Sequence, residues 1–151
     1  MLITLTDVNK NNYDAVCELS VADDQLDYIA ENAYSIVQSK FFPSYQTRAI
    51  CLDGEPVGFF MWVPDDDQRI TIWRFMVDKN HQNKGIGRKA LSLAIDEIRC
   101  SDPLKAIAIS YNPNNLVAKN LYASLGFVEV GMDEEVEEML AVIGGLSSES
   151  C

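Results

Sequence analysis

The chain reads Gln82-Asn83-Lys84-Gly85-Ile86-Gly87 between a β-forming run, Ile70–Val77, and an amphipathic helix predicted over Gly87–Arg99. Glycines allow the backbone to turn tightly and to approach a ligand closely. The first N–H groups of the following helix have no partners inside the helix and point outward. A strand, a glycine-bearing loop and a helix in this order therefore predict an anion site suited to a pyrophosphate.

The distribution of charge supports this interpretation of the loop. The chain has 12 basic and 23 acidic residues and a net charge of −11. Residues 79–95 nevertheless contain no acidic residue, and their basic residues are Lys79, Lys84, Arg88 and Lys89. One third of all basic residues therefore lies within a short part of an acidic chain, which indicates attraction of phosphate.

Other phosphate-binding motifs fit this loop less well. A P-loop requires GxxxxGK[ST], which the sequence lacks. A dinucleotide fingerprint requires GxGxxG, whereas only two glycines occur here and Lys89-Ala90 follows. The structural alternative is a tight turn between a strand and a helix, with basic residues that are simply solvated.

A second motif lies further along the chain and carries a family resemblance. Its sequence is Asn115-Leu116-Val117-Ala118-Lys119-Asn120-Leu121-Tyr122-Ala123-Ser124-Leu125-Gly126-Phe127. This matches N-x-x-A-x-x-L-Y-x-x-x-G-F, and residues 82–87 match Q/R-x-x-G-x-G/A. With both motifs on the expected elements, the sequence resembles the GNAT family of N-acetyltransferases over essentially the whole chain.

The order of predicted elements indicates an α/β domain with a mixed sheet. Strands are predicted over Leu2–Leu5, Arg48–Leu52, Pro56–Val63, Ile70–Val77, Leu104–Ser110, Phe127–Gly131 and Glu135–Ile143, and helices over Asn9–Ser20, Asp23–Ser39, Gly87–Arg99 and Asn114–Leu125. Pro64–Gln68 is expected to be an acidic loop. The resemblance implies a GNAT-like, mostly antiparallel central sheet of about seven strands flanked by about four helices, with a splayed cofactor-binding strand pair. One domain is expected over 1–146, with a tail at 147–151.

The resemblance also implies an acetyl-CoA site and a catalytic residue. The residues that it implies for cofactor binding are Phe75, Met76, Val77, Gln82, Asn83, Lys84, Gly85, Ile86, Gly87, Arg88, Lys89 and Asn115. Backbone groups of Met76 and Val77 would pair with the pantetheine arm, and the loop would hold the pyrophosphate. Tyr122 would protonate the departing thiolate as general acid. The structural alternative for Tyr122 is an aromatic side chain packed under the sheet.

No general base is assigned from the sequence. Many family members carry a glutamate on the central strand before the loop, but Thr71-Ile72-Trp73-Arg74 contains no acid. A water molecule or another carboxylate would then act as the base, or the amine would arrive already neutral. His81, the only histidine, is expected to mark the junction of strand and loop. No metal is expected, because the four cysteines form no CxxC pair and no zinc spacing with His81.

The resemblance implies that the acceptor lies under the first two helices and the loop between the last strands, and these regions are acidic. Residues 11–39 contain six acidic residues and no lysine or arginine. In the helix predicted over Asp23–Ser39, the apolar face would consist of Leu26, Ile29, Ala30, Ala33 and Val37. The opposite face would bind the substrate through Asp24, Asp27, Tyr28 and Glu31, which share one side at helical spacing. Further acidic residues crowd the final hairpin at 133–138 and residues 65–67.

Carboxylates about one helical turn apart are suited to a polyamine. Gln25–Ile29, Leu52–Phe59 and Trp73–Phe75 also resemble segments of bacterial spermine/spermidine acetyltransferases. The prediction is therefore acetylation of a primary amine of spermine or spermidine. The alternatives are a basic protein or peptide amine, another small amine such as an aminoglycoside, a non-catalytic acetyl-CoA-binding module, and a merely solvated acidic face.

Composition and charge limit the partners and the cellular location that we expect. The net charge of −11 argues against nucleic acid and anionic membrane as partners. Apolar runs such as Val57–Val63 are far shorter than the ~20 residues of a membrane-spanning helix, and Met1–Lys10 lacks the order of a secretory signal. We expect a cytoplasmic protein with reduced cysteines. The family resemblance suggests a homodimer.

Overall fold

The computed structural model describes residues 2–21, 32–66, 68–135 and 137–144. Their elements are β1 (Ile3–Asp7), α1 (Tyr13–Glu18), α2 (Asn32–Phe41), β2 (Gln46–Leu52), β3 (Glu55–Asp66), β4 (Arg69–Val77), the 3-10 helix η2 (Lys79–His81), α3 (Ile86–Ser101), β5 (Ala106–Tyr111), α4 (Leu116–Ser124), β6 (Val128–Asp133) and β7 (Glu138–Ile143). The order of predicted strands and helices is confirmed.

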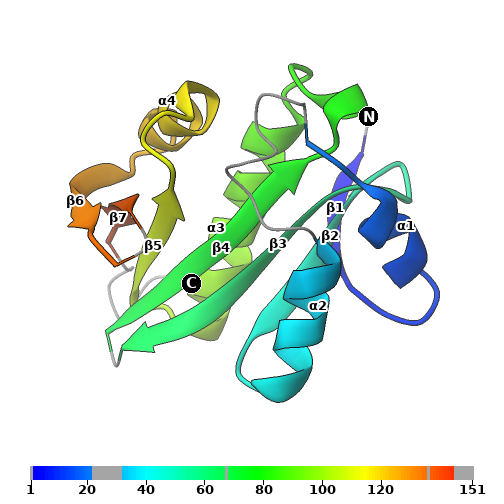
Figure 1. Ribbon diagram of the computed structural model, residues 1–151, viewed down its shortest axis with the longest axis horizontal. Coiled ribbons are helices and arrows are strands. Elements are labelled where there is room, and N and C mark those ends of the chain that lie inside the picture. Colours follow the sequence, from blue (N-terminus) through cyan, green and yellow to red (C-terminus); the bar gives the residue numbers. More distant parts are fainter. Residues whose placement is uncertain (1, 22–31, 67, 136, 145–151) are drawn as a thin grey trace.

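The seven strands form one sheet in the order β1-β2-β3-β4-β5-β7-β6. All neighbouring pairs are antiparallel except β4 and β5, which are parallel. Figure 1 shows α3 on one face of the sheet and α1 and α2 on the other. The mixed, mostly antiparallel sheet predicted from the sequence is therefore confirmed.

Each face of the sheet buries its own apolar cluster. The larger cluster joins α3 to the sheet, and all of the predicted apolar face of that helix is buried: Ala90, Leu91, Ala94, Ile95 and Ile98. The smaller cluster lies under α1 and includes Val16, Phe59 and Met61. Burial on both faces makes the sheet a rigid support for the loops at its edge.

Two local predictions are wrong. Pro64–Gln68 is not wholly a loop, because β3 runs to Asp66 and continues to pair with β4 across a register shift. In α2, Val37 is 58% exposed and Ala33 is exposed, although both were assigned to the apolar face. The helix instead buries Asn32 and Ser35, because polar contacts with the neighbouring elements turn that side toward the sheet.

The splay of the central strands positions the candidate site. β4 pairs with β5 only from Arg69–Ala106 to Ile72–Ile109. Just beyond this point β4 carries an extra residue against β3, and Arg74 has a left-handed backbone with φ of 58°. Such a bulge bends a strand, and Figure 1 shows β4 and β5 diverging from their paired ends.

Candidate active site

Two cavities meet where β4 and β5 separate. One has a volume of about 430 Å³ and the other about 220 Å³. Both are lined by Phe75 on β4 and by Asn115, Ala118 and Tyr122 at the start and along α4. Atoms placed in the two cavities would therefore approach each other beside these four residues. We refer to the smaller as the cofactor cavity and to the larger as the acceptor cavity.

The cofactor cavity lies between the end of β4 and the first turns of α3 and α4. Ten of its lining residues are Phe75, Met76, Val77, Gln82, Asn83, Gly85, Gly87, Arg88, Asn115 and Tyr122. These are among the residues that the two sequence motifs nominated. The remaining nominated residues, Lys84, Ile86 and Lys89, belong to the same loop and the same helix start but do not line the cavity.

A buried carboxylate holds the loop after β4 in place. Oδ1 of Asp78 accepts a hydrogen bond from the Ser20 N–H at 3.0 Å, and Oδ2 accepts one from the Asn80 N–H at 3.3 Å. Oδ2 also lies 3.4 Å from Nδ1 of His81, and the Lys79 N–H donates to the Ser20 carbonyl at 2.7 Å. Asp78 was not identified from the sequence, although its place just before η2 is a capping position.

The start of α3 has the geometry of an anion site. Gly85 is the N-cap residue and has a left-handed backbone with φ of 79°, which glycine adopts without strain. The N–H groups of the first helical turn follow directly. A Cβ atom added at Gly87 would lie 3.6 Å from both Leu121 and Val77, two residues that line the cavity. The missing side chain therefore leaves room that a pyrophosphate and its pantetheine arm can fill.

The four basic side chains of this segment are exposed around the loop: Lys79, Lys84, Arg88 and Lys89. Arg88 lines the cofactor cavity, and its Nη1 donates to Oγ of Ser124 on α4. Nζ of Lys84 lies 3.5 Å from the Asn80 carbonyl. Arg88 and the start of α3 thus bring positive charge and unpaired N–H groups to the cofactor cavity, which suits a diphosphate ligand.

The edge of β4 that faces β5 has no partner strand after Ile72 within the described sheet. Phe75, Met76 and Val77 follow on this segment, and their side chains are buried. The Val77 carbonyl accepts a hydrogen bond from Nε2 of Gln82 at 2.9 Å. An unpaired strand edge can accept an extended ligand as an additional strand, so pairing of Met76 and Val77 with pantetheine stays a prediction.

Tyr122 stands at the junction of the two cavities. Its side chain is 5% exposed, and its hydroxyl makes no hydrogen bond within the described residues. Burial is the main cause that raises its pKa above the ordinary value of 10.0, with additions from Tyr111 and Glu138. The phenol therefore keeps its proton at neutral pH, as a proton donor to a leaving thiolate requires.

Asn115 both caps α4 and lines the two cavities. Its side-chain oxygen accepts a hydrogen bond from the Ala118 N–H at 3.2 Å and so caps α4. The amide nitrogen of Asn115 has no partner within the described residues. Since the residue is buried and lines both cavities, that NH₂ group remains available to a ligand.

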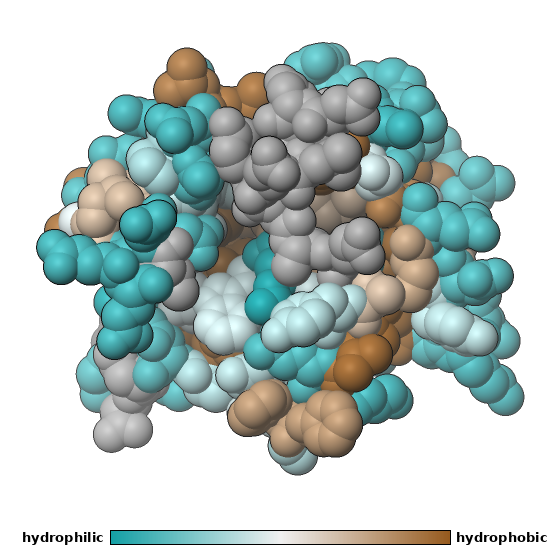
Figure 2. Space-filling view, in the orientation of Figure 1, coloured by the Kyte–Doolittle hydropathy of each residue, from teal (hydrophilic) through white to brown (hydrophobic). Residues whose placement is uncertain are grey.

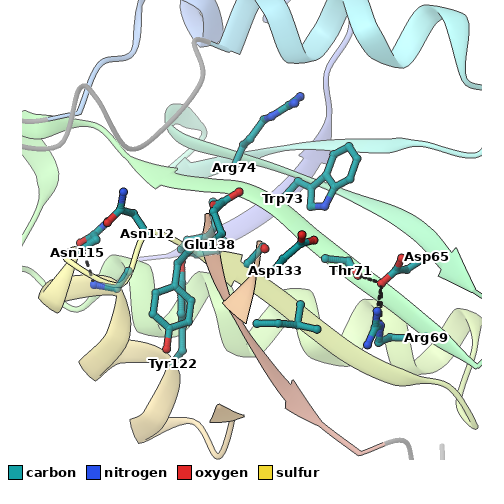
Figure 3. Close-up of a pocket in the computed structure, with 15 residues that line it drawn as sticks. Asp65, Arg69, Thr71, Trp73, Arg74, Asn112, Asn115, Tyr122, Asp133 and Glu138 are labelled. Carbon is teal, nitrogen blue, oxygen red and sulfur yellow. Dashed lines mark hydrogen bonds and ion pairs between the residues drawn. The ribbon is translucent and has the colours of Figure 1, made fainter. Parts of the chain in front are cut away.

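The acceptor cavity is lined by charged groups from four strands. Its charged residues are Asp65 and the two arginines Arg69 and Arg74 from β3 and β4, together with Asp133 and Glu138 from β6 and β7. The space-filling view shows a hollow bordered largely by hydrophilic residues (Figure 2). In the close-up, Glu138 and Asp133 lie in the middle of the group, and Asp65 and Arg69 lie at the end away from Tyr122 (Figure 3).

These charged groups differ in whether they form hydrogen bonds or ion pairs within the described residues. Asp65 forms an ion pair with Arg69, and its Oδ2 also accepts a hydrogen bond from Oγ1 of Thr71 at 3.0 Å. Glu138 makes neither a hydrogen bond nor an ion pair within the described residues. Burial raises its pKa, the nearby Arg74 lowers it, and Asp133 raises it. Glu138 is thus the carboxylate most available to a ligand.

Arg74 is held on the other side of the cavity. Its Nη1 donates to Oγ of Ser35 and to the side-chain oxygen of Gln38, both on α2. Its guanidinium also lies over the rings of Tyr34 and Trp73, at 5.4 and 5.3 Å from their centroids. Burial lowers the pKa of Arg74. From the sequence, Arg74 was noted only as part of a stretch that lacks the acid carried there by many family members.

The sequence assigned acceptor binding to residues of another segment. These four candidates, Asp24, Asp27, Tyr28 and Glu31, lie outside the described residues. Glu138 was noted only as one of several acids in the final hairpin. Its position at the start of β7, in the cavity that Tyr122 also lines, depends on how that hairpin is placed beside β5. The hydropathy pattern of the hairpin does not reveal this.

Among the described residues, no helix has the length and apolar character needed to cross a membrane. The described ranges also contain no cluster of three or more His, Cys, Asp or Glu side chains placed to hold a metal ion. Cys17 and Cys51 are free thiols.

Comparison with known proteins adds an independent finding. Residues 12–127 match the family described as "Acetyltransferase (GNAT) family". A "Probable spermine N(1)-acetyltransferase" of Bacillus subtilis subsp. natto is 31% identical over 134 residues, which cover 84% of this chain and 88% of that protein. A "Spermine/spermidine N(1)-acetyltransferase" of Bacillus subtilis is 30% identical over the same shares of both chains.

Solved structures show the same architecture. The spermidine N-acetyltransferase of Vibrio cholerae, solved with CoA and spermine, superposes with a TM-score of 0.74 at 16% identity, covering 93% of this chain and 92% of that one. At this identity the likeness concerns the fold alone. It includes the seven-stranded sheet and flanking helices described above.

Proposed function

Because this chain belongs to the acetyltransferase (GNAT) family and is an acetyl-CoA-dependent N-acetyltransferase, we propose that it acetylates a primary amine of spermine or spermidine. The observation that carries the proposal is the meeting of two unlike cavities at Tyr122. One is lined by Arg88 and the start of α3, and the other holds carboxylates. The names of its two relatives from Bacillus subtilis support a polyamine acceptor.

The cofactor cavity is suited to the two ends of acetyl-CoA. The loop at 82–87 and the start of α3 would hold the pyrophosphate, and the open edge of β4 would hold the pantetheine arm. The thioester would then lie near Tyr122, Asn115 and Phe75, which border both cavities. Fixing the thioester beside the amine supplies much of the rate enhancement, because orientation replaces a bimolecular encounter.

The acceptor cavity is suited to a linear cation. Glu138 and Asp133 lie in its middle, and Asp65 lies at its far end (Figure 3). Ammonium groups along one chain would meet these carboxylates while one terminal nitrogen reaches the thioester. The side chain of Trp73 also lines this cavity and offers an aromatic face, which favours cations.

Tyr122 would complete the reaction as general acid. Its buried, protonated phenol would donate a proton to the sulfur as the bond between carbon and sulfur breaks. A backbone N–H near Val77 would stabilise the negative charge that develops on the carbonyl oxygen. Neither step requires a metal ion. Binding of the acceptor by Asp24, Asp27, Tyr28 and Glu31, which the sequence predicted, remains part of the proposal.

The experiment that tests the proposal measures CoA release by chromatography with a panel of acceptors. Spermine, spermidine, putrescine and butylamine form a series in which cationic nitrogens are removed one after another. We expect kcat/KM to fall along that series, because each lost ammonium group forfeits a carboxylate partner. Efficient turnover of lysine-rich peptides with none of the polyamines would contradict the proposed acceptor and leave the family assignment intact.

The homodimer expected from the resemblance also remains part of the proposal. β6 is one of the two edge strands of the described sheet, and three alternate residues on it are exposed and apolar: Val128, Val130 and Met132. An exposed edge of this kind supports association with a second copy. Light scattering coupled to size-exclusion chromatography would distinguish a dimer from a monomer. The expected cytoplasmic location stays a prediction.

A further inference from the structure

Glu138 presents a half-buried carboxylate to the acceptor cavity without any hydrogen bond or ion pair within the described residues. Figure 3 shows it between Arg74 on β4 and Tyr122 on α4. The hydroxyl of Tyr122 also lacks a partner, although that side chain is buried. Two unsatisfied polar groups in one cavity indicate a ligand with polar atoms between them.

We propose that Glu138 binds the ammonium group of the acceptor and removes the proton that must leave before the nitrogen can attack. This inference rests on the proposed function, because it requires an amine acceptor. It fills the role that the sequence left unassigned, since residues 71–74 of β4 carry no acid. Glu138 lines the acceptor cavity from β7, which pairs with β5.

The surroundings of Glu138 suit a base. The charged groups that act on it are Arg74 from β4 and Asp133 from β6, and Tyr122 on α4 lines the same cavity. Burial and Asp133 raise the pKa of Glu138, while Arg74 lowers it. A carboxylate with a raised pKa is a stronger base than an ordinary one.

Arg74 does not neutralise this carboxylate. Its guanidinium is held by Ser35 and Gln38 of α2, and no ion pair joins it to Glu138. It therefore acts at a distance, by favouring the ionised form of Glu138 without occupying its oxygens. The carboxylate remains free to accept hydrogen bonds from an incoming ammonium group.

Other candidates for the base fit less well. Asp65 lies at the far end of the cavity and is bonded to Arg69 and Thr71. Asp133 is exposed, although it lies directly across from Glu138 in the hairpin. His81 lines the cofactor cavity and faces Asp78 there. Glu138 is thus the candidate that is half-buried, unpaired and near the junction.

The reaction gives each proton that leaves the acceptor nitrogen a defined destination. The acceptor nitrogen arrives with three protons and keeps one in the amide. The first passes to the Glu138 carboxylate and then to solvent, which frees the nitrogen lone pair. That pair forms the bond between nitrogen and carbon, the bond between carbon and sulfur breaks, and the sulfur takes the proton of Tyr122. The second nitrogen proton then restores the phenol of Tyr122.

The test compares Glu138→Gln with the matched control Glu137→Gln. Glu137 is the adjacent glutamate, is exposed and does not line the cavity. With saturating acetyl-CoA, kcat and kcat/KM for spermidine are measured against pH for both variants and for the unmodified protein. We expect kcat of Glu138→Gln to fall about 100-fold near pH 7, with the control unchanged.

The shape of the pH profile separates a base from a mere binding group. Without Glu138 the rate should depend on free amine alone and rise about tenfold per pH unit below the pKa of the amine. A raised KM with unchanged kcat and an unchanged profile would overturn the inference. So would full activity of Glu138→Gln.

Two further measurements keep the outcomes distinct. Glu138→Asp keeps the carboxylate but retracts it, so it should retain the acid limb of the profile at a reduced rate. The dissociation constant for acetyl-CoA, measured for each variant, shows whether the fold and the cofactor cavity survive. If the unmodified protein acetylates only a peptide amine, the polyamine proposal fails, and the same comparison made with that peptide tests Glu138 by itself. If it acetylates no amine, both proposals fail.

Discussion

The rings of Tyr111 and Tyr122 lie edge to face, with centroids 5.3 Å apart. Only one of the two hydroxyls is engaged, because that of Tyr111 donates a hydrogen bond to Glu129 at 2.6 Å. Tyr111 thus forms a fixed wall, while the phenol of Tyr122 faces the junction of the cavities without a partner in the described residues. The proton of Tyr122 is therefore available for transfer.

Replacing Tyr122 by phenylalanine should remove that proton and little else. We expect kcat to fall by about 100-fold, in the range usual for loss of a general acid, while the dissociation constant for acetyl-CoA changes little. Steady-state kinetics and calorimetric titration would measure the two quantities. Tyr13→Phe, at an exposed position on α1, is the matched control. An equal loss in both variants would contradict a specific role for Tyr122.

The pH dependence at the alkaline side follows from the burial of Tyr122. Because burial raises its pKa above 10.0, the protonated form persists at a pH at which an exposed tyrosine begins to ionise. We therefore expect kcat of the unmodified protein to show no decline between about pH 8 and about pH 10 from this group. A kcat profile that falls with a midpoint near 9 would show that the phenol ionises too easily to serve as the donor.

Gly87→Ala should weaken acetyl-CoA binding without unfolding the protein. The added Cβ would make ordinary contacts at 3.6 Å with Leu121 and Val77 but would occupy space in the cofactor cavity. We expect the dissociation constant to rise at least tenfold, which corresponds to about 1.4 kcal/mol, with an unchanged or higher Tm. Gly144→Ala, where an added Cβ meets open space, is the control. Unaltered affinity would mean that the ligand passes elsewhere.

Asp78→Ala should lower the free energy of unfolding by about 1–3 kcal/mol, because two backbone N–H groups lose their buried acceptor. The loss concerns the hydrogen bonds from Ser20 and Asn80. Urea unfolding would measure it, and Asp102→Ala, at an exposed carboxylate after α3, would serve for comparison. We also expect weaker acetyl-CoA binding, since the loop loses its anchor. Equal stability of the two variants would argue against the anchoring role.

Arg74→Met should shift the pH profile if Glu138 acts as the base. Arg74 lowers the pKa of Glu138, so its removal should raise that pKa and move the acid limb of kcat/KM to higher pH. The variant should also lose stability, because Ser35 and Gln38 on α2 lose a donor. Trp73→Phe, which keeps the charge, should leave the acid limb in place. A shift to lower pH in Arg74→Met would contradict the assignment.

Local signals were sufficient to nominate most of the residues that line the cofactor cavity. The motif at 82–87 lies on one continuous stretch of chain, and glycine spacing, helix start and charge occur within it. A ligand site built from consecutive residues depends on short-range geometry, which spacing reports directly. Tyr122 was found for a related reason, because it lies on one helix turn in fixed relation to Asn115 and Gly126.

Polar contacts between distant segments explain why the apolar face predicted for α2 was wrong. Hydropathy placed Ala33 and Val37 inside, whereas the helix turns Asn32 and Ser35 inward. Asn32 donates to the Val16 carbonyl at 2.9 Å, and Ser35 accepts a hydrogen bond from Arg74. The spacing of apolar residues does not reveal hydrogen-bond partners that lie 16 and 39 residues away in the sequence.

The sequence alone thus determined the family resemblance, the order of strands and helices, and the glycine-bearing loop at 82–87, since each depends on neighbouring residues. Only the tertiary structure decided how β4 and β5 separate at the Arg74 bulge and which acidic residues line a cavity with Tyr122. Glu138 is one of five acidic residues within 133–138. Its place in that cavity is set by the pairing of β7 with β5, and such long-range pairing leaves no mark on local spacing.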